Sequence, residues 1–528
     1  MVQENKHLIV KKYLENHSLV ESNITSFNDF IEYRMQEIVN DVSENIDSDD
    51  FEINLGKINV GKPQLTEADG SSSLIMPYEA RLRNLTYSAP VTLEITVKKE
   101  DQVDSEIVEI GRIPIMVKSK NCNTFGLTKE QLVGNYNDPL DPGGYFMIKG
   151  NERVMVMAED LAENQPFIET NNKNELMLRL FSLKGTYRIP SIIKENKEGI
   201  FEISFSKFKD LPILVILKAL GLTKESEITK YIGKETDGVI VNLYEFVDLA
   251  TQEDAMIYIA EKTNLQGTKK EILQRVHQRI DSYLFPHIGL KKEDRMKKAV
   301  TLCKLLKQFL IAKDNPKLKT DKDHYANKRV RLSGDLLSTL FRVNLGILMR
   351  DIQYSLQKSS KRRKFFSIKI IAKSTLFSHR VESAIATGSW TGERSGITQN
   401  MDKTNYLSTI SQLQRVSSML ASDQENFLAR TLHPTHYGRF CPIETPEGTE
   451  IGLRKNLSVL SKISTRTNLD EEKFMKSLEQ YGFQRADGKI KIKDIVFKKI
   501  DVFLNGRFIG NIDNPEEFVK IIREIVDK

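Results

Sequence analysis

The hydrophobic pattern changes its period several times along the chain, and this change limits the fold more than any other feature of the sequence. Apolar and polar residues alternate from Val91 to Val97 and again from Phe201 to Phe205, which is the pattern of half-buried strands. From Ile272 to Ile280 apolar residues recur instead at helical spacing. Because 528 residues also exceed what one hydrophobic core can organise, we expect an α+β protein of several domains.

Two short links between apolar runs predict β-hairpins. Gly150-Asn151 joins two strand-like stretches, and both residue types tolerate a positive φ. Asn505-Gly506 joins a second pair of such stretches and is the strongest short hairpin signal. We therefore expect a tight turn at each of these links.

Several segments carry helix signals. Ser26 and Asp29 have the spacing of a helix cap ahead of an apolar stripe that runs from Phe30 to Val39. Asn514 followed by Pro515 predicts the cap and first turn of a final helix. Helical spacing of apolar residues also predicts helices over residues 302–310 and 336–347.

Composition excludes several classes of protein. Hydrophobic residues make up 40% and charged residues 28%, so the chain is ordinary for a globular protein. Cys122, Cys303 and Cys441 are far apart and form no Cys-x-x-Cys pair, so we expect neither disulfides nor a zinc ribbon. No apolar run is long enough to cross a bilayer and the N-terminus lacks a secretory signal, so we expect a cytoplasmic protein without membrane contact.

Positive charge is concentrated in one stretch. From Ile352 to Val381 there are eight Lys or Arg residues and no Asp or Glu. Four of the eight are consecutive, namely Lys361, Arg362, Arg363 and Lys364. Such a stretch presents a positive surface, which suits a phosphate backbone. A solvated basic loop explains it equally well at this point.

Catalytic motifs are missing. The one local carboxylate cluster, Asp47-Ser48-Asp49-Asp50, has no neighbouring Lys or Arg to bind a triphosphate, which favours a solvated acidic turn over a magnesium site. His433 and His436 are zinc-like residue types, yet no spacing around them fits a zinc site. No phosphate-binding loop, dinucleotide fingerprint or nucleophile elbow is present.

The segment His433–Gly448 is predicted to be a rigid, hydrogen-bonded loop. It lies in a polar, loop-rich region of the chain, residues 387–453. Its three prolines lower the entropy cost of fixing Arg439, Glu444 and Glu447 in place. Side chains held in this way suit either a ligand or a partner chain, and the residues alone leave both open.

Polar side chains that suit phosphate and ribose flank this loop. They are Arg394, Gln399, Asn400, Arg415 and Arg430. Trp390, Tyr406 and Tyr437 are the nearby aromatic residues, and we expect packing rather than base stacking for each. The pattern therefore indicates a polyanion-binding surface without an aromatic platform.

The loop sequence is also specific enough to indicate a family. Residues 433–448 read HPTHYGRFCPIETPEG and are followed by Ile451-Gly452-Leu453 and Asn456-Leu457-Ser458. This run resembles the fork region of the second-largest subunit of cellular RNA polymerases. Other blocks agree in the family's order: Glu79–Tyr87, Gly111–Met116, Gly143–Phe146, Gly150–Arg153 and Asp323–Arg329. The resemblance is weakest between residues 170 and 320.

The resemblance implies the N-terminal half of that subunit, in the form called B″ in archaea where it is split. The implied domains are the N-terminal helices with the first piece of a protrusion (1–168), an inserted lobe (169–320), the second piece of the protrusion (321–386), the fork (387–465) and the start of an external domain (466–528). The chain ends at Lys528, before the family's hybrid-binding domain, wall and clamp would follow.

Site roles are implied by position in the family motif. Gln399, Asp402, Arg415 and Arg430 match residues that line the RNA–DNA hybrid, and Arg394 and Asn400 stand beside them. Pro446 and Glu447 match the loop near the growing RNA end. Asp402 would organise its loop by hydrogen bonding, because a carboxylate facing phosphate repels it. The motif residues expected to be structural are His433, His436, Tyr437, Glu444 and Gly448.

One departure from the bacterial pattern concerns the drug pocket. Tyr406 and Gln412 stand where the bacterial family members have Pro and His, so the rifamycin pocket should be absent or poor.

The implied activity is that of DNA-directed RNA polymerase, a nucleotidyltransferase. Expected partners are the B′ half, the halves of the largest subunit, other polymerase subunits, general transcription factors, the DNA template and the RNA transcript. No catalytic residue is expected on this chain, and Mg²⁺ in the assembled enzyme would be held mainly by the largest subunit. A stand-alone nucleic-acid-binding protein and a self-sufficient nucleotidyltransferase are the alternatives.

Overall fold

A computed structural model describes most of the chain, in two compact units. The described residues are 6–43, 52–67, 71–99, 102–171, 173–185, 187–233, 237–361, 374–390, 395–420, 423, 425–465, 470–485 and 500–526. Unit 1 comprises Met1–Leu161 and Asp323–Arg466, and unit 2 comprises Ala162–Lys322 and Thr467–Lys528. Each unit mixes helices and strands, which confirms the predicted α+β, multidomain class.

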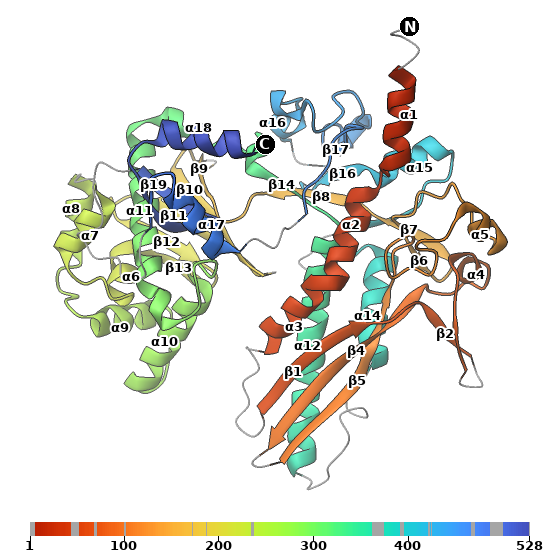
Figure 1. Cartoon of the computed structure of the whole chain (residues 1–528). Coiled ribbons are helices and arrows are strands. Elements are labelled where there is room, and N and C mark those ends of the chain that lie inside the picture. Colours follow the sequence, from red (N-terminus) through yellow and green to blue (C-terminus); the bar gives the residue numbers. More distant parts are fainter. Residues whose placement is uncertain are drawn as a thin grey trace. The chain divides into compact units, whose positions relative to one another are not determined.

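The sheet with the longest strands in unit 1 consists of β1 (Glu52–Val60), β4 (Ser88–Lys99) and β5 (Gln102–Pro114), all antiparallel. The predicted alternation from Val91 to Val97 lies on β4, and its four apolar side chains are buried. Helix α3 (Met35–Ser43) packs against β1 and α14 (Ser374–Thr387) against β5, as the lower half of Figure 1 shows. The apolar face of the sheet thereby joins the core of unit 1.

The N-terminal helices correct one prediction. Helix α2 (Glu21–Asp29) continues through a π-helical turn, η1 (Phe30–Arg34), into α3. Ser26 therefore lies inside a helix and is not a cap. Its Oγ accepts a hydrogen bond of 3.1 Å from the backbone N–H of Gly334, at the start of α12 (Ser333–Lys361). The hydroxyl joins two packed helices, so the cap spacing was coincidental.

Two smaller sheets in unit 1 carry most of the family motifs. The order of one is β15 (Thr398–Asn400), β7 (Asn151–Met155) and β6 (Phe146–Ile148). The order of the other is β14 (Lys328–Arg331), β8 (Met157–Leu161), β16 (Arg415–Ser418) and β17 (Arg454–Asn456). In the second sheet β16 runs parallel to β8, whereas the other pairs are antiparallel. Both stretches of the sequence that make up unit 1 thus contribute strands to this one sheet.

The hairpin between β6 and β7 is present but shifted by one residue. Ile148 pairs with Asn151, so the turn is Lys149-Gly150, with φ of 48° and 76°. A Cβ at Gly150 would lie 2.5 Å from the Asn84 side chain, so glycine is needed here for space as well as for φ. The predicted turn at Gly150-Asn151 is wrong by this one position.

Short elements complete unit 1. They are α1 (Lys6–Asn16), β2 (Gln64–Thr66), β3 (Ser72–Leu74), α4 (Pro77–Leu82), α5 (Lys129–Gly134), η4 (Tyr325–Asn327), α15 (Tyr406–Leu413), α16 (Phe427–Arg430), η5 (Pro434–His436) and η6 (Gly448–Glu450). The described elements between residues 387 and 453 are no longer than eight residues, which agrees with the predicted loop-rich segment.

Unit 2 is built on a five-stranded antiparallel sheet covered by helices. The strand order is β13 (Phe208–Pro212), β12 (Phe201–Phe205), β11 (Tyr187–Glu195), β10 (Leu176–Lys184) and β9 (Pro166–Thr170). The helices are α6 (Ile213–Ala219), α7 (Glu225–Ile232), α8 (Asp237–Glu245), α9 (Gln252–Lys262), α10 (Lys269–Tyr283) and α11 (Arg295–Asp314), with short turns η2 (Lys292–Asp294) and η3 (Pro316–Leu318). The predicted strand at 201–205 and the predicted helices at 272–280 and 302–310 are confirmed as β12, α10 and α11.

The last segment of the chain also belongs to unit 2. It contains α17 (Glu471–Glu479), β18 (Phe483–Arg485), β19 (Ile500–Leu504), β20 (Arg507–Ile512) and α18 (Pro515–Val526). The Asn505-Gly506 hairpin turn is confirmed, with φ of 49° and 78°. Asn514 caps α18 as predicted, since its Oδ1 accepts from the N–H of Glu517 at 3.4 Å. A half-buried ion pair of 2.8 Å joins Lys304 of α11 to Asp501 of β19.

Some predictions stay untested. The side chains of Lys361 to Lys364 and the acidic turn at 47–50 lie outside the residues that the structure describes. The division into protrusion, lobe, fork and external domain stays a prediction. No described helix has the length and apolar character to cross a membrane.

The close contact between α2 and α12 at Gly334 predicts that a glycine-to-alanine substitution in a helix lowers stability. Glycine in the interior of a helix, where Gly346 of α12 lies, normally destabilises the helix by about 1 kcal/mol relative to alanine. A Cβ at Gly334 would, however, lie 2.1 Å from the backbone oxygen of Ser26, whereas nothing lies within 4 Å of a Cβ at Gly346 in the same helix. Gly334→Ala is expected to lower the free energy of unfolding by about 1–3 kcal/mol. Gly346→Ala should leave it unchanged or raise it, and equal effects in urea unfolding would contradict the packing described here.

Candidate nucleic-acid interface

Four of the residues predicted to contact nucleic acid lie on two of the small sheets of unit 1 and on the loop that follows β15, whereas Arg430 ends α16 and Pro446 and Glu447 lie in the His433–Gly448 loop. Gln399 and Asn400 belong to β15, Asp402 follows that strand, and Arg415 begins β16. Asn400 is exposed, and Gln399, Asp402 and Arg415 are half-buried. Arg415 is close enough to help lower the pKa of Asp402, behind the larger effect of hydrogen bonds from Thr404. Arg394 lies outside the described residues.

A buried glutamine fixes the loop that carries these side chains. The Gln412 amide accepts from the N–H of Asp402 at 2.7 Å and donates to the carbonyl of Asn400 at 2.8 Å. Asp402 in turn accepts from the N–H of Thr404 at 3.0 Å, which is the loop-organising hydrogen bond expected from the sequence. Both ends of the Gln412 amide are used, so the side chain acts as a clamp on residues 400–402.

Ion pairs join the separate family blocks. The Glu152 carboxylate lies 2.7 Å from the Arg81 guanidinium and also forms an ion pair with Lys403. Arg81 donates to the hydroxyl of Tyr145 at 3.2 Å, and Arg153 donates to the side chain of Asn400. The blocks that begin at residues 79, 143 and 150 therefore converge on the β15 loop.

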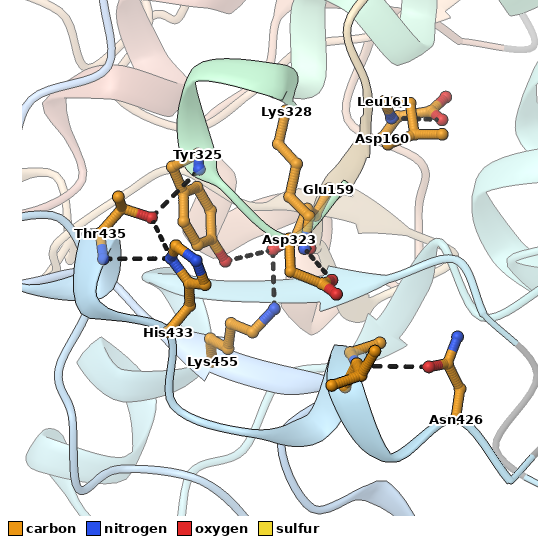
Figure 2. A network of polar contacts seen from close by, with 12 residues as sticks. Glu159, Asp160, Leu161, Asp323, Tyr325, Lys328, Asn426, His433, Thr435 and Lys455 are labelled. Carbon is orange, nitrogen blue, oxygen red and sulfur yellow. Dashed lines mark hydrogen bonds and ion pairs between the residues drawn. The ribbon is translucent and has the colours of Figure 1, made fainter. Parts of the chain in front are cut away.

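A buried carboxylate lies at the centre of the second sheet. Figure 2 shows Glu159 of β8 between Lys328 of β14 and Lys455 of β17. The Glu159 carboxylate lies 2.8 Å from the Lys328 ammonium and 2.9 Å from that of Lys455. It also accepts a hydrogen bond of 2.6 Å from the Tyr325 hydroxyl. Asp323 lies 3.3 Å from Lys328, so two carboxylates balance two lysines.

The pKa values of Glu159 and Lys455 depend on burial and on each other's charge. Burial favours the neutral acid at Glu159, but Lys455, Lys328 and Tyr325 together outweigh it and lower its pKa to about 2. Burial lowers the pKa of Lys455, and Glu159 offsets this only incompletely. The site thus stabilises the charged form of Glu159, and this carboxylate in turn stabilises the charged forms of Lys328 and Lys455.

The His433 end of the motif packs on this network. Thr435 Oγ1 accepts from the N–H of Tyr325 at 3.1 Å and lies 2.7 Å from His433 Nδ1, as Figure 2 shows. The N–H of Thr435 also donates to Nδ1 at 3.2 Å. The buried ring of His436 lies edge-on to Tyr325, with ring centres 4.8 Å apart. Burial and the nearby Lys455 lower the pKa of His436 to about 4, so it is neutral at pH 7.

The Glu444 end of the motif is exposed, but it is hydrogen-bonded to α15 and β17. Glu444 accepts from Ser411 and from Asn456, each at 2.6 Å. Thr445 donates to the carbonyl of Arg454 at 2.9 Å. Arg430 donates to the carbonyls of Thr449 at 2.6 Å and Ile451 at 3.2 Å. The hydrogen bonds predicted for this loop are confirmed, and its rigidity stays a prediction.

Two of the three aromatic predictions are wrong. Trp390 is buried as predicted, and its Nε1 donates to the carbonyl of Leu336 at 3.0 Å. Tyr406 and Tyr437 are each 62% exposed, because the first turn of α15 and the turn after η5 direct them outward. Packing within this chain therefore does not explain them.

Sequence reasoning missed the residues that hold the site together. Glu159, Lys455 and Gln412 were not proposed as structural, whereas Tyr325 and Lys328 at least fell within a quoted block. Polar residues next to apolar strand runs are ordinary at strand ends, so nothing local marked them. Among the described residues no group of three His, Cys, Asp or Glu side chains is arranged to hold a metal ion; magnesium binding elsewhere stays a prediction.

Glu159→Gln tests the buried network. Lys455 would lose its counter-charge and Lys328 would keep only Asp323, so we expect the free energy of unfolding to fall by about 3 kcal/mol at pH 7. The folded-state pKa of Glu159 is about 2 and the unfolded value 4.5, so its contribution is present above pH 4.5 and lost as the pH falls toward 2. The difference between wild type and variant in urea unfolding should therefore shrink below pH 4.5.

A carboxylate in an exposed ion pair provides the matched control. Glu79 lies 2.9 Å from Arg83 with its side chain 41% exposed, so Glu79→Gln should change stability by less than about 0.5 kcal/mol. A loss at Glu159 no larger than that at Glu79, or one independent of pH, would contradict the buried network.

Gln412→Leu tests the clamp on the β15 loop. It removes one acceptor and one donor from part-buried backbone groups, and each lost hydrogen bond costs about 0.5–1.5 kcal/mol. Amide hydrogen exchange at Asp402 and tryptic cleavage after the exposed Lys403 should both become faster. Gln412→Glu keeps the acceptor for Asp402 N–H, so its effect on Asp402 should be smaller. Unchanged exchange in Gln412→Leu would show that the loop is fixed by other contacts.

Comparison with known proteins agrees with this geometry. The family model described as RNA polymerase beta subunit matches residues 18–379, which is more than half of the chain. The model described as RNA polymerase Rpb2, domain 3, matches residues 399–463. The second match spans Gln399, Gln412, Arg415, the His433–Gly448 motif and Lys455.

Relatives cover nearly the whole chain. DNA-directed RNA polymerase subunit Rpo2N of Halobacterium salinarum is 36% identical over 512 residues, which are 92% of this chain and 98% of the relative. The Rpo2N of Methanothermobacter thermautotrophicus is 37% identical over 88% of this chain and 95% of its own length. Subunit Rpo2 of Saccharolobus shibatae is 35% identical over 98% of this chain but only 47% of its own length, so the chain spans about half of that relative. The chain belongs to the RNA polymerase beta subunit family.

Proposed function

We propose that the chain is the N-terminal half of the second-largest subunit of a DNA-directed RNA polymerase, the subunit called B″ or Rpo2N. The observation that carries this proposal is the convergence of the family blocks on one hydrogen-bonded scaffold, in a chain that covers 98% of a Rpo2N relative. The enzyme as a whole is a nucleotidyltransferase, EC 2.7.7.6, which acts in transcription. An enzyme that transcribes works beside the DNA, so we place the chain in the cytoplasm.

Within this enzyme the chain grips nucleic acid. Gln399, Asn400 and Arg415 offer neutral and cationic donors near one loop, which suits the sugar–phosphate backbone of an RNA–DNA hybrid. The Gln412 clamp fixes that loop before nucleic acid binds, so less conformational entropy is lost on binding. Contacts of this kind hold any sequence, as a processive polymerase requires.

Catalysis is assigned to the assembled enzyme. Bond formation is attack of the RNA 3′ hydroxyl on the α-phosphate of a nucleoside triphosphate, which Mg²⁺ assists. The described residues of this chain bring together no carboxylate set that fits a metal ion, and we assign the metal to the largest subunit. Partners are accordingly the rest of the second-largest subunit, the halves of the largest subunit, the other subunits, general transcription factors, template and transcript.

Purification of the native protein tests the assignment. The chain should be recovered in a large assembly that contains a catalytic largest subunit and that polymerises ribonucleotides on DNA. A chain that is recovered alone and polymerises ribonucleotides unaided would contradict it.

A pair of variants tests the grip within the assembled polymerase. Each phosphate that a cation neutralises contributes about 0.9 to the slope of log affinity against log salt concentration. Arg415→Ala should weaken binding to a template–transcript duplex and reduce that slope by about 1, whereas Gln399→Ala should weaken binding with the slope unchanged. Identical slopes for both variants, with subunit composition intact, would contradict phosphate contact by Arg415.

A further inference from the structure

Helix α8 of unit 2 is apolar on two sides, and the described part of the chain covers only one of them. On the covered side, Val239 of the helix and Phe246 just after it are buried in the core of unit 2. On the other side four large apolar side chains are exposed, namely Ile240, Val241, Tyr244 and, in the turn after the helix, Val247. A helix that is apolar all round is normally buried, and a group of large exposed apolar side chains marks an interaction site. We call these four side chains the α8 surface.

The exposed side chains of the α8 surface form one ridge. Ile240, Tyr244 and Val247 follow one another at intervals of four and three residues, which is the spacing of neighbours on one side of a helix. The Ile240 side of the ridge is 57% exposed and Tyr244 is 82% exposed, so the ridge stands out from unit 2. Ridges with this spacing pack into the grooves of a second helix. The spacing therefore favours a helix as the occupant.

The sequence around the α8 surface is acidic. From Asp237 to Glu261 there are six Asp or Glu residues and no Lys or Arg. One of the six, Glu253, forms an ion pair of 3.1 Å with Lys269. Glu245 and Asp248 adjoin the exposed apolar side chains in the sequence and are themselves exposed. Nucleic acid requires an excess of cations and is repelled here, whereas a protein segment with Lys or Arg beside its apolar residues is attracted.

Hydrogen bonds fix α8 on the core of unit 2, so the α8 surface is preorganised. The buried Asn242 accepts from the N–H of Phe201 at 2.9 Å and donates to two backbone carbonyls, each at 2.8 Å. At the end of the helix, Lys218 donates to the carbonyl of Phe246 at 2.7 Å. Lys218 is only 2% exposed, so it adds no basic group to the surface. A helix that is ordered before its partner arrives loses little conformational entropy on binding.

We propose that the α8 surface docks a basic amphipathic helix that belongs to a protein other than the polymerase subunits. The ridge of Ile240, Tyr244 and Val247 packs against the apolar side of that helix, and its Lys or Arg side chains meet Glu245 and Asp248. The docking surface lies in unit 2, apart from the residues of unit 1 that are assigned to nucleic acid.

The position of α8 in the sequence favours a partner from outside the enzyme. All of the family blocks quoted above lie in unit 1, whereas α8 lies between residues 170 and 320, where the resemblance to the family is weakest. A subunit that every such polymerase contains would be expected to bind the shared blocks. A surface outside these blocks suits instead a protein that acts on this particular enzyme.

A synthetic peptide tests the proposal on the full chain. The probe is a fluorescent helical peptide of about 18 residues, or about five turns, with a leucine stripe flanked by lysines. In an anisotropy titration it should bind the wild-type chain, and Ile240→Ser with Tyr244→Ser should weaken binding by about 10-fold or more. The matched control is Ile107→Ser with Tyr136→Ser in unit 1, which changes the same residue types at 68% and 76% exposure. This control should bind the peptide within about 2-fold of wild type.

A charge reversal tests the polarity of the α8 surface. Glu245→Lys with Asp248→Lys should weaken binding of the lysine peptide by about 10-fold. The same variant should bind a second peptide, in which glutamates replace the lysines, more tightly than the wild-type chain does. A misfolded variant could not show this gain of binding, so the exchange separates loss of charge complementarity from loss of structure.

A wild-type chain that does not bind the lysine peptide, or that binds it as tightly as every variant does, would overturn the proposal. Self-association of the chain that is lost in Ile240→Ser with Tyr244→Ser would assign the α8 surface to a second copy instead. In the assembled polymerase Tyr244→Cys should react with a maleimide above the background of Cys441 labelling, and protection would overturn the proposal because a subunit would cover α8. The peptide titration uses the chain alone, so failure of the chain to join a polymerase would refute only the proposed function.

Discussion

The motif region of this chain depends on one buried carboxylate. Glu159 accepts from Tyr325 and pairs with Lys328 and Lys455, and so it ties three strands of one sheet together. A buried ion pair adds little net stability over an apolar core, but removing one partner leaves an uncompensated charge. The network therefore mainly determines how the strands of this sheet are arranged. An arrangement in which one of these partners is missing would leave a buried charge unpaired.

Two surfaces with different chemistry follow from that geometry. On the β15 side, Gln412 holds a polar loop whose side chains suit phosphate and ribose. On the motif side, His433 and Thr435 pack on Tyr325, and the loop beyond them exposes apolar side chains over a hydrogen-bonded base.

Local signals predicted the regular elements well and the site less well. The alternation from Val91 to Val97 and the hairpin at Asn505-Gly506 depend only on neighbouring residues, so both were found. Ser26 was misread because its hydroxyl bonds to Gly334, a partner 308 residues away. Glu159 was missed for the same reason, since Lys455 lies 296 residues along the chain. The rigidity of the motif loop was predicted because prolines act locally, whereas the exposure of Tyr406 and Tyr437 has no local signal in the sequence.

A cryo-electron microscopy structure of the transcribing polymerase that contains this chain tests the central claim most directly. The proposed grip on nucleic acid predicts Arg415 and Gln399 within hydrogen-bonding reach of the sugar–phosphate backbone. A map in which protein alone covers the β15 loop would contradict it.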